Sequence, residues 1–264
     1  MVSKSTVPAI REQKRAYGSK PIVMITAYDA PGARMVDGTA TDEIVKISGV
    51  NHDSRSVGQG DLFACISGAE HDGHSYAIEA INGGAAALLV ERELNLAIPQ
   101  VVVPDVRKSI GFASAAVYGH PSKQMKVIGI TGTAGKTTVA QALAQTLKAC
   151  GESAGVIGTL EGSHTTPEAP EFQKKLSQMQ SRGDEWVCVE VSSHGLEFGR
   201  VQGTEFAATV FTNLSPEHLD FHKDMEQYFL AKRRLFDHES GLAVVSVADE
   251  WGNRLARELE EIGH

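Results

Sequence analysis

The sequence has few cysteines and no long apolar run. Its 264 residues include only three cysteines, Cys65, Cys150 and Cys188, which lie far apart and form no CxxC pair. So few cysteines argue against a disulfide framework or a cysteine zinc site, and they are typical of a reducing cytoplasm. No apolar run reaches the roughly 18 residues of a membrane-spanning helix, and residues 1–20 are too polar for a signal peptide.

The sequence also lacks an excess of positive charge. It has 25 Lys and Arg against 33 Asp and Glu, a formal net charge of −8. Binding to a nucleic-acid backbone needs a basic stripe, which is missing, so we expect no nucleic-acid partner and no membrane partner. The 42% of apolar residues is ordinary for a globular protein, and the length allows one large domain or two small ones.

The pattern of apolar segments divides the chain into three parts. Residues 1–38 contain one short apolar run at 22–25, which predicts a single strand before a loop. Residues 43–120 alternate strands with helices, which indicates a compact α/β domain. The strands are predicted at 44–50, 61–66, 85–90 and 100–103, and the helices at 74–82 and from about residue 105 to 117.

From residue 121 the alternation becomes regular. Apolar strands separated by helices imply a parallel sheet covered on both faces, so the expected fold is α/β throughout. The strands are predicted at 127–131, 155–159, 186–191, 206–212 and 242–247, and the helices at 136–150, 169–181 and 225–238, with one more helical stretch before His264.

The most informative segment is VIGITGTAGKTT at residues 127–138, an apolar strand that leads into a glycine-rich turn. Glycines let backbone N–H groups converge on phosphate oxygens, and the following helix N-terminus favours anions. Lys136 would reach the β- and γ-phosphates, and the Thr137 hydroxyl would ligate magnesium. The alternative is a tight strand–helix turn with an incidental lysine, because Ile130 stands where the G-x-x-x-x-G-K-[ST] pattern has its first glycine. We favour ATP binding, through Gly132, Thr133, Gly135, Lys136, Thr137 and Thr138.

This loop resembles the ATP loop of the Mur ligases. Three further stretches follow in that family's order and resemble its MurE-type branch: TTPEAP at 165–170, EVSSHGL at 190–196 and FTNLSPEHLDFH at 211–222. DSR at 53–55 and GDLF at 60–63 resemble the opening of the family's UDP-binding domain. The resemblance runs from about residue 43 to the C-terminus. It implies a UDP-binding domain at 43–120 and the first part of an ATP-binding central domain at 121–264.

The resemblance implies peptidoglycan precursor synthesis by ATP-dependent amide formation. The substrates would be UDP-MurNAc-L-Ala-D-Glu and a diamino acid, either meso-diaminopimelate or L-lysine. A substrate carboxylate would attack the γ-phosphate, and the amine would then displace phosphate from the acyl phosphate. Positioning and charge neutralisation dominate phosphoryl transfer, so ATP and Mg²⁺ are the expected cofactors of a monomeric enzyme.

By resemblance, Thr137 and Glu190 would hold one Mg²⁺ and His218 a second. Oxygen ligands suit Mg²⁺, whereas a histidine ligand is less usual. Lys232 by pattern alone is a solvated helix lysine, but the family's lysine here carries a carbamate made with CO₂ and becomes an anionic metal ligand. That reaction needs the neutral amine, which burial favours. The candidate catalytic residues are therefore Lys136, Glu190, His218 and Lys232.

The resemblance also implies substrate contacts. Thr165, Thr166 and Ser192 would contact the muramoyl-peptide, and Arg200 would grip a carboxylate or pyrophosphate with its guanidinium fork. Ser54 and the residues HDG at 71–73 would contact uridine and pyrophosphate.

Two histidines invite other interpretations. His222, four residues after His218, would share a helix face with it, but no third zinc ligand suggests itself. His194 follows two serines, yet sequence adjacency does not establish the geometry of a catalytic triad. We expect both histidines to be structural.

Residues 1–38 carry a different resemblance, to the start of ketopantoate hydroxymethyltransferase. One barrel strand cannot close a barrel, so we expect this extension to pack poorly and to be catalytically silent. The family's third domain, which contacts the incoming amino acid, is expected to be missing, and the chain is expected to be inactive or nearly so as a ligase. The alternatives are a non-catalytic nucleotide- or precursor-binding module, a hydroxymethyltransferase, and a generic P-loop kinase.

Overall fold

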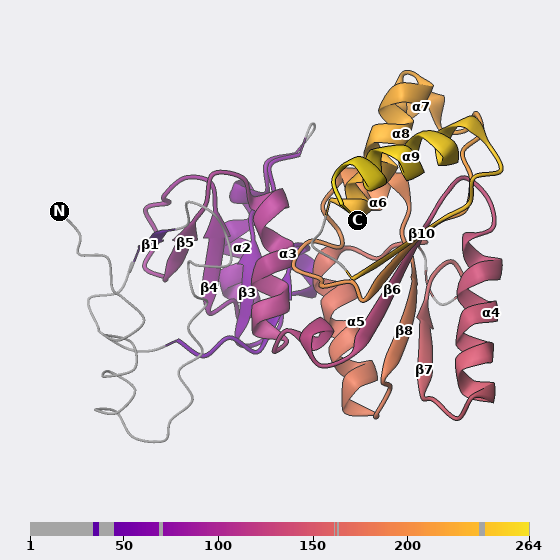
Figure 1. The fold of residues 1–264 in the computed structure, drawn as a ribbon. Helices are drawn as coiled ribbons and strands as arrows, with labels where there is room; N and C mark the ends of the chain where they lie inside the picture. Colours follow the sequence, from indigo (N-terminus) through magenta and orange to yellow (C-terminus); the bar gives the residue numbers. More distant parts are fainter. Residues whose placement is uncertain are drawn as a thin grey trace.

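The computed structural model of the chain describes residues 34–36, 45–68, 71–160, 162, 164–237 and 241–263. They form two α/β domains that lie side by side (Figure 1). The strand predicted at 22–25 lies outside the described residues. Within the described ranges, no helix is long and apolar enough to cross a membrane.

The first domain is built on a five-stranded sheet with the order β1-β5-β4-β3-β2. Its strands are β1 (Arg34–Val36), β2 (Gly49–Asn51), β3 (Asp61–Ala64), β4 (Ala87–Val90) and β5 (Gln100–Val102). All neighbours are parallel except β1, which runs antiparallel to β5. Alternate residues of the central strands enter two different cores, so helices α2 (Ala77–Gly83) and α3 (Val106–Val117) can cover the sheet.

Strand β1 corrects one expectation about the N-terminal segment. Arg34–Val36 falls within the extension that was expected to pack poorly, but it pairs with Gln100–Val102. The edge of β5 offers unpaired N–H and C=O groups, which a neighbouring extended segment can satisfy. These three residues therefore belong to the first sheet.

The second domain contains a parallel sheet with the order β10-β9-β6-β8-β7. The strands are β6 (Lys126–Thr131), β7 (Ala154–Ile157), β8 (Trp186–Glu190), β9 (Ala208–Phe211) and β10 (Leu242–Val245). The helices are α4 (Lys136–Ala149), α5 (Ala169–Ser181), α6 (Ser193–Glu197), α7 (Leu219–His222), α8 (Met225–Arg233) and α9 (Glu250–Glu261). The predicted α/β fold with a parallel second sheet is confirmed.

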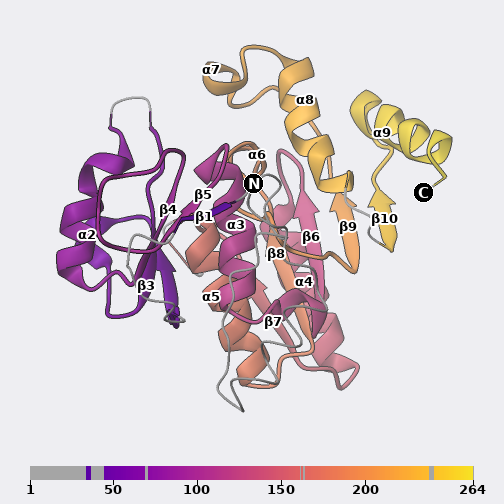
Figure 2. The same ribbon diagram turned by 90° about the vertical axis from the view of Figure 1, so that its left-hand side faces the viewer.

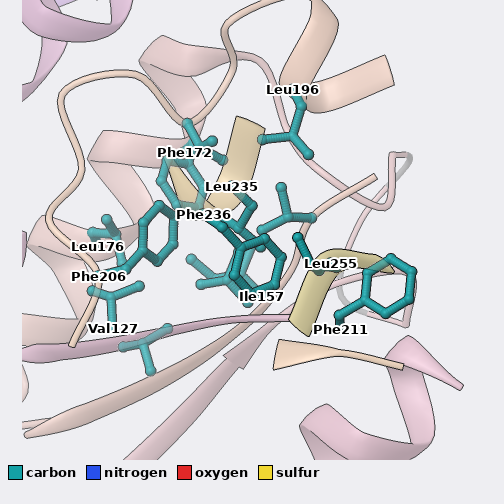
Figure 3. Close-up of a cluster of buried hydrophobic side chains, with 14 of the residues drawn as sticks. Val127, Ile157, Phe172, Leu176, Leu196, Phe206, Phe211, Leu235, Phe236 and Leu255 are labelled. Atoms are coloured by element: carbon teal, nitrogen blue, oxygen red, sulfur yellow. The ribbon is translucent and has the colours of Figure 1, made fainter. Parts of the chain in front are cut away.

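The two faces of this sheet are covered by different helices. Val127 and Ile157 lie in a large core with Phe172 and Leu176 of α5 (Figure 3). The opposite face packs against α4, mainly through Ala140 and other small or aliphatic side chains. The strands are apolar on both faces because both are buried, as expected of a parallel sheet.

Two short helices and one helix end differ from the sequence prediction. Helices α6 and α7 were not predicted, since five and four residues are too short to show a periodic pattern. The helix predicted at 225–238 ends at Arg233 and continues as a 3₁₀ turn, Arg234–Phe236. The expectation that His218 and His222 share a helix face is wrong, because His218 precedes α7 with a left-handed backbone at φ 55°.

The two domains meet through α3 and α5. Ala169, at the start of α5, is buried in the core of the first domain. Gly111 of α3 lies so close to Gln202 that an added Cβ would approach the Gln202 carbonyl oxygen within 2.6 Å. The connecting turn is anchored as well, because the Ser122 hydroxyl accepts a hydrogen bond from the Glu205 N–H. Figure 2 shows the junction from the side.

Candidate functional site

The glycine-rich turn lies between β6 and α4, at the carboxyl edge of the second sheet. Gly132 has φ 147° and Gly135 has φ 85°, conformations that favour glycine. A side chain at position 132 would also collide with the Thr212 hydroxyl. Lys136 folds back over the turn, and its Nζ donates to the carbonyl oxygens of Gly132 and Thr133, both at 2.8 Å. The strand, turn and helix predicted from residues 127–138 are confirmed.

Asn213, which was not predicted as a site residue, holds this turn from the neighbouring strand end. Its Nδ2 donates to the Ala134 carbonyl at 3.1 Å, and its Oδ1 accepts from the Ala134 N–H at 3.0 Å. The Asn213 carbonyl accepts from the Thr133 N–H, and the Thr212 hydroxyl donates to the Ala134 carbonyl. No local pattern pointed to Asn213, because only the parallel pairing of β9 with β6 brings the two strand ends to the same edge.

Glu190 ends β8 beside the turn and is only 1% exposed. Its carboxylate accepts hydrogen bonds from the Thr137 hydroxyl at 2.7 Å, the Thr159 N–H at 3.0 Å and the Thr159 hydroxyl at 3.2 Å. Gly158 makes room for it, since a Cβ there would overlap Glu190. In the described part of the chain, no lysine or arginine forms an ion pair with this carboxylate. Thr159 and Gly158 were also missed from sequence.

The Thr137 and Glu190 oxygens fit a hard divalent cation. They lie side by side, and the carboxylate is buried with only neutral donors around it, which leaves its charge without a direct counterion. The described residues contain no group of three or more His, Cys, Asp or Glu side chains that could hold a metal. A Mg²⁺ ion here would therefore take its other ligands from phosphate oxygens and water, as is usual for this ion.

Lys232, on α8, lies on the other side of the turn and is 1% exposed. Its Nζ donates to the Gly132 carbonyl at 2.8 Å and stands 4.5 Å from the centre of the Tyr228 ring. Burial, together with the nearby Lys136 charge, lowers the pKa of Lys232 to about 7. Lys232 is therefore buried, and not the solvated lysine that the helix pattern alone predicts. Arg234 is exposed and paired with Glu197, as a surface charge should be.

His218 lies at the rim of the site. Its side chain is half-exposed, its Nε2 is 3.9 Å from the Glu217 carboxylate, and its ring centre is 5.1 Å from that of His194. The His194 ring stacks on Phe221 at 4.1 Å. His222 is buried, and its Nε2 is 2.9 Å from the Ser193 hydroxyl. The structural role expected for His222 is confirmed.

The 165–170 stretch runs directly beneath Glu190. The Thr166 hydroxyl is fully buried, donates to the Glu190 carbonyl and accepts from the Ser192 N–H, both at 2.9 Å. Its side chain thus positions β8 and α6, and the substrate contacts predicted for it and for its partly exposed neighbour stay predictions. That neighbour, Thr165, has its hydroxyl 3.0 Å from the Thr159 hydroxyl.

Ser192 and Arg200 are tied to the protein in this structure. The Ser192 hydroxyl caps α6 by accepting from the Gly195 N–H. Arg200 donates to the Thr166 carbonyl at 2.9 Å and forms an ion pair of 2.6 Å with Glu168. The Arg200 Nε is buried without a hydrogen-bond partner in the structure, which leaves one donor of the fork unused.

The first-domain candidates lie apart from the phosphate loop, on the other sheet. Ser54 opens a 3₁₀ turn, Ser54–Ser56, after β2. Asp72 contacts the His74 Nδ1 at 2.6 Å and pairs with Arg92 at 2.5 Å, and these hydrogen bonds hold the pKa of Asp72 well below its usual range. The Asp72 carboxylate is thus already engaged within the domain.

Two family models match the chain. One is described as the Mur ligase middle domain and matches residues 130–264, and the other as the Mur ligase family, catalytic domain, and matches residues 46–149. Both matches begin after residue 38, so they give no support to the resemblance of residues 1–38 to ketopantoate hydroxymethyltransferase.

The chain is also similar to curated proteins named UDP-N-acetylmuramoyl-L-alanyl-D-glutamate–2,6-diaminopimelate ligase. The one from Streptomyces coelicolor is 44% identical over 245 residues, which are 87% of this chain and 47% of the relative. The one from Gloeobacter violaceus is 42% identical over 232 residues, 83% of this chain and 47% of the relative. The chain therefore spans about half the length of these relatives.

Solved structures of Mur ligases are also similar to this chain. A ligase of that same name superposes with a TM-score of 0.71 at 30% identity, over 81% of this chain and 46% of the other. MurF from Acinetobacter baumannii superposes with a TM-score of 0.62 at 20% identity, over 84% of this chain and 48% of the other, which supports the fold alone.

Proposed function

This chain belongs to the Mur ligase family, and from that premise we propose that it carries the ATP site and the UDP-precursor site of a peptidoglycan precursor ligase. The proposed reaction joins a diamino acid to UDP-MurNAc-L-Ala-D-Glu through an amide bond. Diaminopimelate is favoured over lysine because the similar curated proteins are named for it. The proposed location is the cytoplasm, where a UDP-linked precursor and ATP are available.

The observation that carries the proposal is the adjacency of Thr137 and Glu190 beside the phosphate loop. The loop N–H groups and Lys136 would bind the phosphates of ATP, and Thr137 and Glu190 would hold Mg²⁺. The ion supplies charge neutralisation at the transferring phosphoryl group. Phosphoryl transfer depends mainly on positioning and on such neutralisation, so the chain needs no nucleophilic side chain of its own.

The bond changes in this proposal balance without a further reactant. A carboxylate oxygen of the precursor attacks the γ-phosphorus of ATP, and the bond to the ADP oxygen breaks. The amine of the diamino acid then attacks the acyl carbon, inorganic phosphate leaves, and the amine loses a proton. Lys136 flanks the loop, where it would offset the negative charge of the phosphates.

For Lys232 we propose the carbamate. The supporting observations are its burial and its pKa of about 7, which keep a large share of the amine neutral near physiological pH. The neutral nitrogen would bond to the carbon of CO₂ and lose a proton, giving an anionic oxygen ligand. His218, at the rim of the site, and the carbamate would be ligands of a second Mg²⁺ ion. Carbon-13 NMR of the chain in labelled bicarbonate would show a carbamate signal that Lys232→Met removes.

The experiment that tests the proposed function measures binding and turnover in parallel. Calorimetry should detect Mg²⁺-dependent ATP binding and, separately, binding of UDP-MurNAc-L-Ala-D-Glu. Glu190→Gln should abolish the Mg²⁺ dependence, and Glu185→Gln, at the opposite end of β8, should not. A chain that binds neither ATP nor the precursor would contradict the proposal.

The second candidate is binding without turnover. Radiolabelled diaminopimelate incorporation separates the two candidates, because only a ligase forms the amide.

A further inference from the structure

Thr131 carries a buried hydroxyl that finds no hydrogen-bond partner among the described residues. The residue ends β6, directly before the phosphate loop, and it is fully buried. A buried polar group without a partner destabilises a fold, so such groups are rare and need a physical explanation. One explanation is a group that joins the hydroxyl only when the site is chemically complete.

Helix α8 and the 3₁₀ turn after it run back along the end of β6. Three of their side chains, spaced at successive helical turns, contact β6 and the loop in the reverse order of the chain. The contacts are Tyr228 with Thr133 at 3.3 Å between hydroxyls, Lys232 with the Gly132 carbonyl at 2.8 Å, and Leu235 over Gly129, where an added Cβ would lie 3.1 Å from it. The side chain that lies between the loop contact and the Leu235 contact is therefore that of Lys232.

The direction of the Thr131 side chain follows from the strand. Residues two apart on a strand point to the same face, so Thr131 faces the side on which Leu235 covers Gly129. Lys232 lies one turn nearer the loop than Leu235, which brings its side chain over Thr131. The hydroxyl and the amine form no hydrogen bond with each other. A carbamate would extend the amine by a carboxylate group and so present an acceptor oxygen to the hydroxyl.

We propose that the Thr131 hydroxyl holds the carbamate of Lys232 by donating a hydrogen bond to one of its oxygens, an inference that rests on the carbamate proposed for this lysine. After the nitrogen bonds to CO₂ and loses a proton, it keeps one N–H, which can still donate to the Gly132 carbonyl. The two contacts would fix the carbamate at its nitrogen and at one oxygen, and leave the other oxygen for Mg²⁺. Thr131 is thus a positioning residue, because it would act through Lys232.

Thr209 provides a matched control on the neighbouring strand. Its hydroxyl is also buried without a partner among the described residues, and the residue is fully buried. Thr209 pairs in register with Gly129, so it points to the same face of the sheet but lies level with Leu235 rather than with Lys232. A Thr-to-Val change at this position removes the same kind of hydroxyl as at Thr131, away from the amine.

The test measures the carbamylated fraction of Lys232 in the whole chain, by carbon-13 NMR over a series of labelled bicarbonate concentrations, with Lys232→Met as the blank. Thr131→Val should lower the carbamylation constant at least about tenfold, because the carbamate loses a hydrogen bond to its charged oxygen. Thr131→Ser keeps the hydroxyl, and Thr209→Val leaves the carbamate contacts intact, so each should stay within about threefold of the parent value.

Urea denaturation in buffer free of CO₂ separates this role from a structural one. There, Thr131→Val replaces an unsatisfied hydroxyl with a methyl group of similar size, so its urea midpoint should equal or exceed that of the parent. A lower midpoint would overturn the inference, since the hydroxyl would then already have a partner.

The NMR outcomes distinguish this inference from the carbamate itself. A parent chain without a carbamate signal refutes the carbamate, and the role of Thr131 with it. A parent signal that Thr131→Val leaves unchanged, that Thr131→Ser loses, or that Thr209→Val lowers as much as Thr131→Val does, overturns the role of Thr131 alone.

Discussion

Replacing Asn213 with alanine tests whether the phosphate loop is held from the neighbouring strand. The substitution removes the two side-chain hydrogen bonds to the Ala134 backbone, of 3.0 and 3.1 Å, and leaves the bond from the Asn213 carbonyl to the Thr133 N–H in place. A neutral hydrogen bond contributes about 0.5–1.5 kcal/mol net. Ala134 is exposed, so water can replace part of each bond, and we expect a combined loss of about 1–2 kcal/mol.

This loss should be measured as weaker ATP binding rather than as unfolding. A cost of about 1–2 kcal/mol corresponds to an affinity reduced about 5- to 30-fold, read by calorimetry with Mg²⁺ present. Asn213→Asp is a sharper variant, because it keeps the acceptor for the Ala134 N–H but loses the donor. It also adds a negative charge where phosphate should bind, so it should bind ATP more weakly than Asn213→Ala does.

The matched control is Asn253→Ala, which removes two comparable hydrogen bonds to backbone carbonyls near α9. It should leave ATP affinity unchanged within about twofold, because these bonds lie away from the phosphate loop. The prediction is refuted if Asn213→Ala or Asn213→Asp binds ATP as tightly as the parent chain. The two side-chain hydrogen bonds from Asn213 to the Ala134 backbone would then not position the loop.

Three further predictions concern the metal site, the buried lysine and the α8–α9 contact. Thr137→Val should lower Mg²⁺-dependent ATP affinity at least about tenfold in calorimetry, with Thr146→Val, at the far end of α4, as a control that stays near the parent value. Lys232 has a pKa of about 7 in the fold against about 10.4 in an unfolded chain, so the unfolded state binds more protons between these pH values. The free energy of unfolding should therefore rise with pH from about 7 to 10 relative to that of Lys232→Met, by roughly 1 kcal/mol per pH unit in urea titrations; parallel curves would contradict this. Arg254→Met removes a bidentate ion pair with Glu226 and a contact over the Phe229 ring. It should lower the free energy of unfolding, measured by urea denaturation, by about 1–2 kcal/mol. Arg257→Met, on the same helix, is the control, and an equal cost for both variants would show that the Arg254 contacts add no stability.

The phosphate loop could be predicted from sequence because its determinants are local. The strand, the glycines and the lysine of residues 127–138 lie within one strand–turn–helix unit, so spacing alone fixes their relation. The parallel arrangement of the second sheet could also be predicted, since apolar strands separated by helices leave few alternatives to it.

The partners of the loop could not be found in this way, because they come from distant strand ends. Thr159 and Asn213 follow β7 and β9, and which strands flank β6 is settled by tertiary packing rather than by any local pattern. The burial of Lys232 is a similar case, since an amphipathic pattern places a lysine outside. His218 was misplaced for a different reason, because its left-handed backbone interrupts the helix that its spacing suggested.

Two ammonium groups, those of Lys136 and Lys232, converge on the single carbonyl oxygen of Gly132. Burial lowers the pKa of both amines, and the Lys136 charge lowers that of Lys232 further. In the chain without the carbamate on Lys232, an arriving triphosphate would reverse this effect by favouring the charged forms of both amines. ATP binding would then draw protons from solution near neutral pH, so its calorimetric enthalpy would vary with the ionisation enthalpy of the buffer. Proton uptake by the loop lysines is thus coupled to nucleotide binding through electrostatics, without any change in the position of the loop.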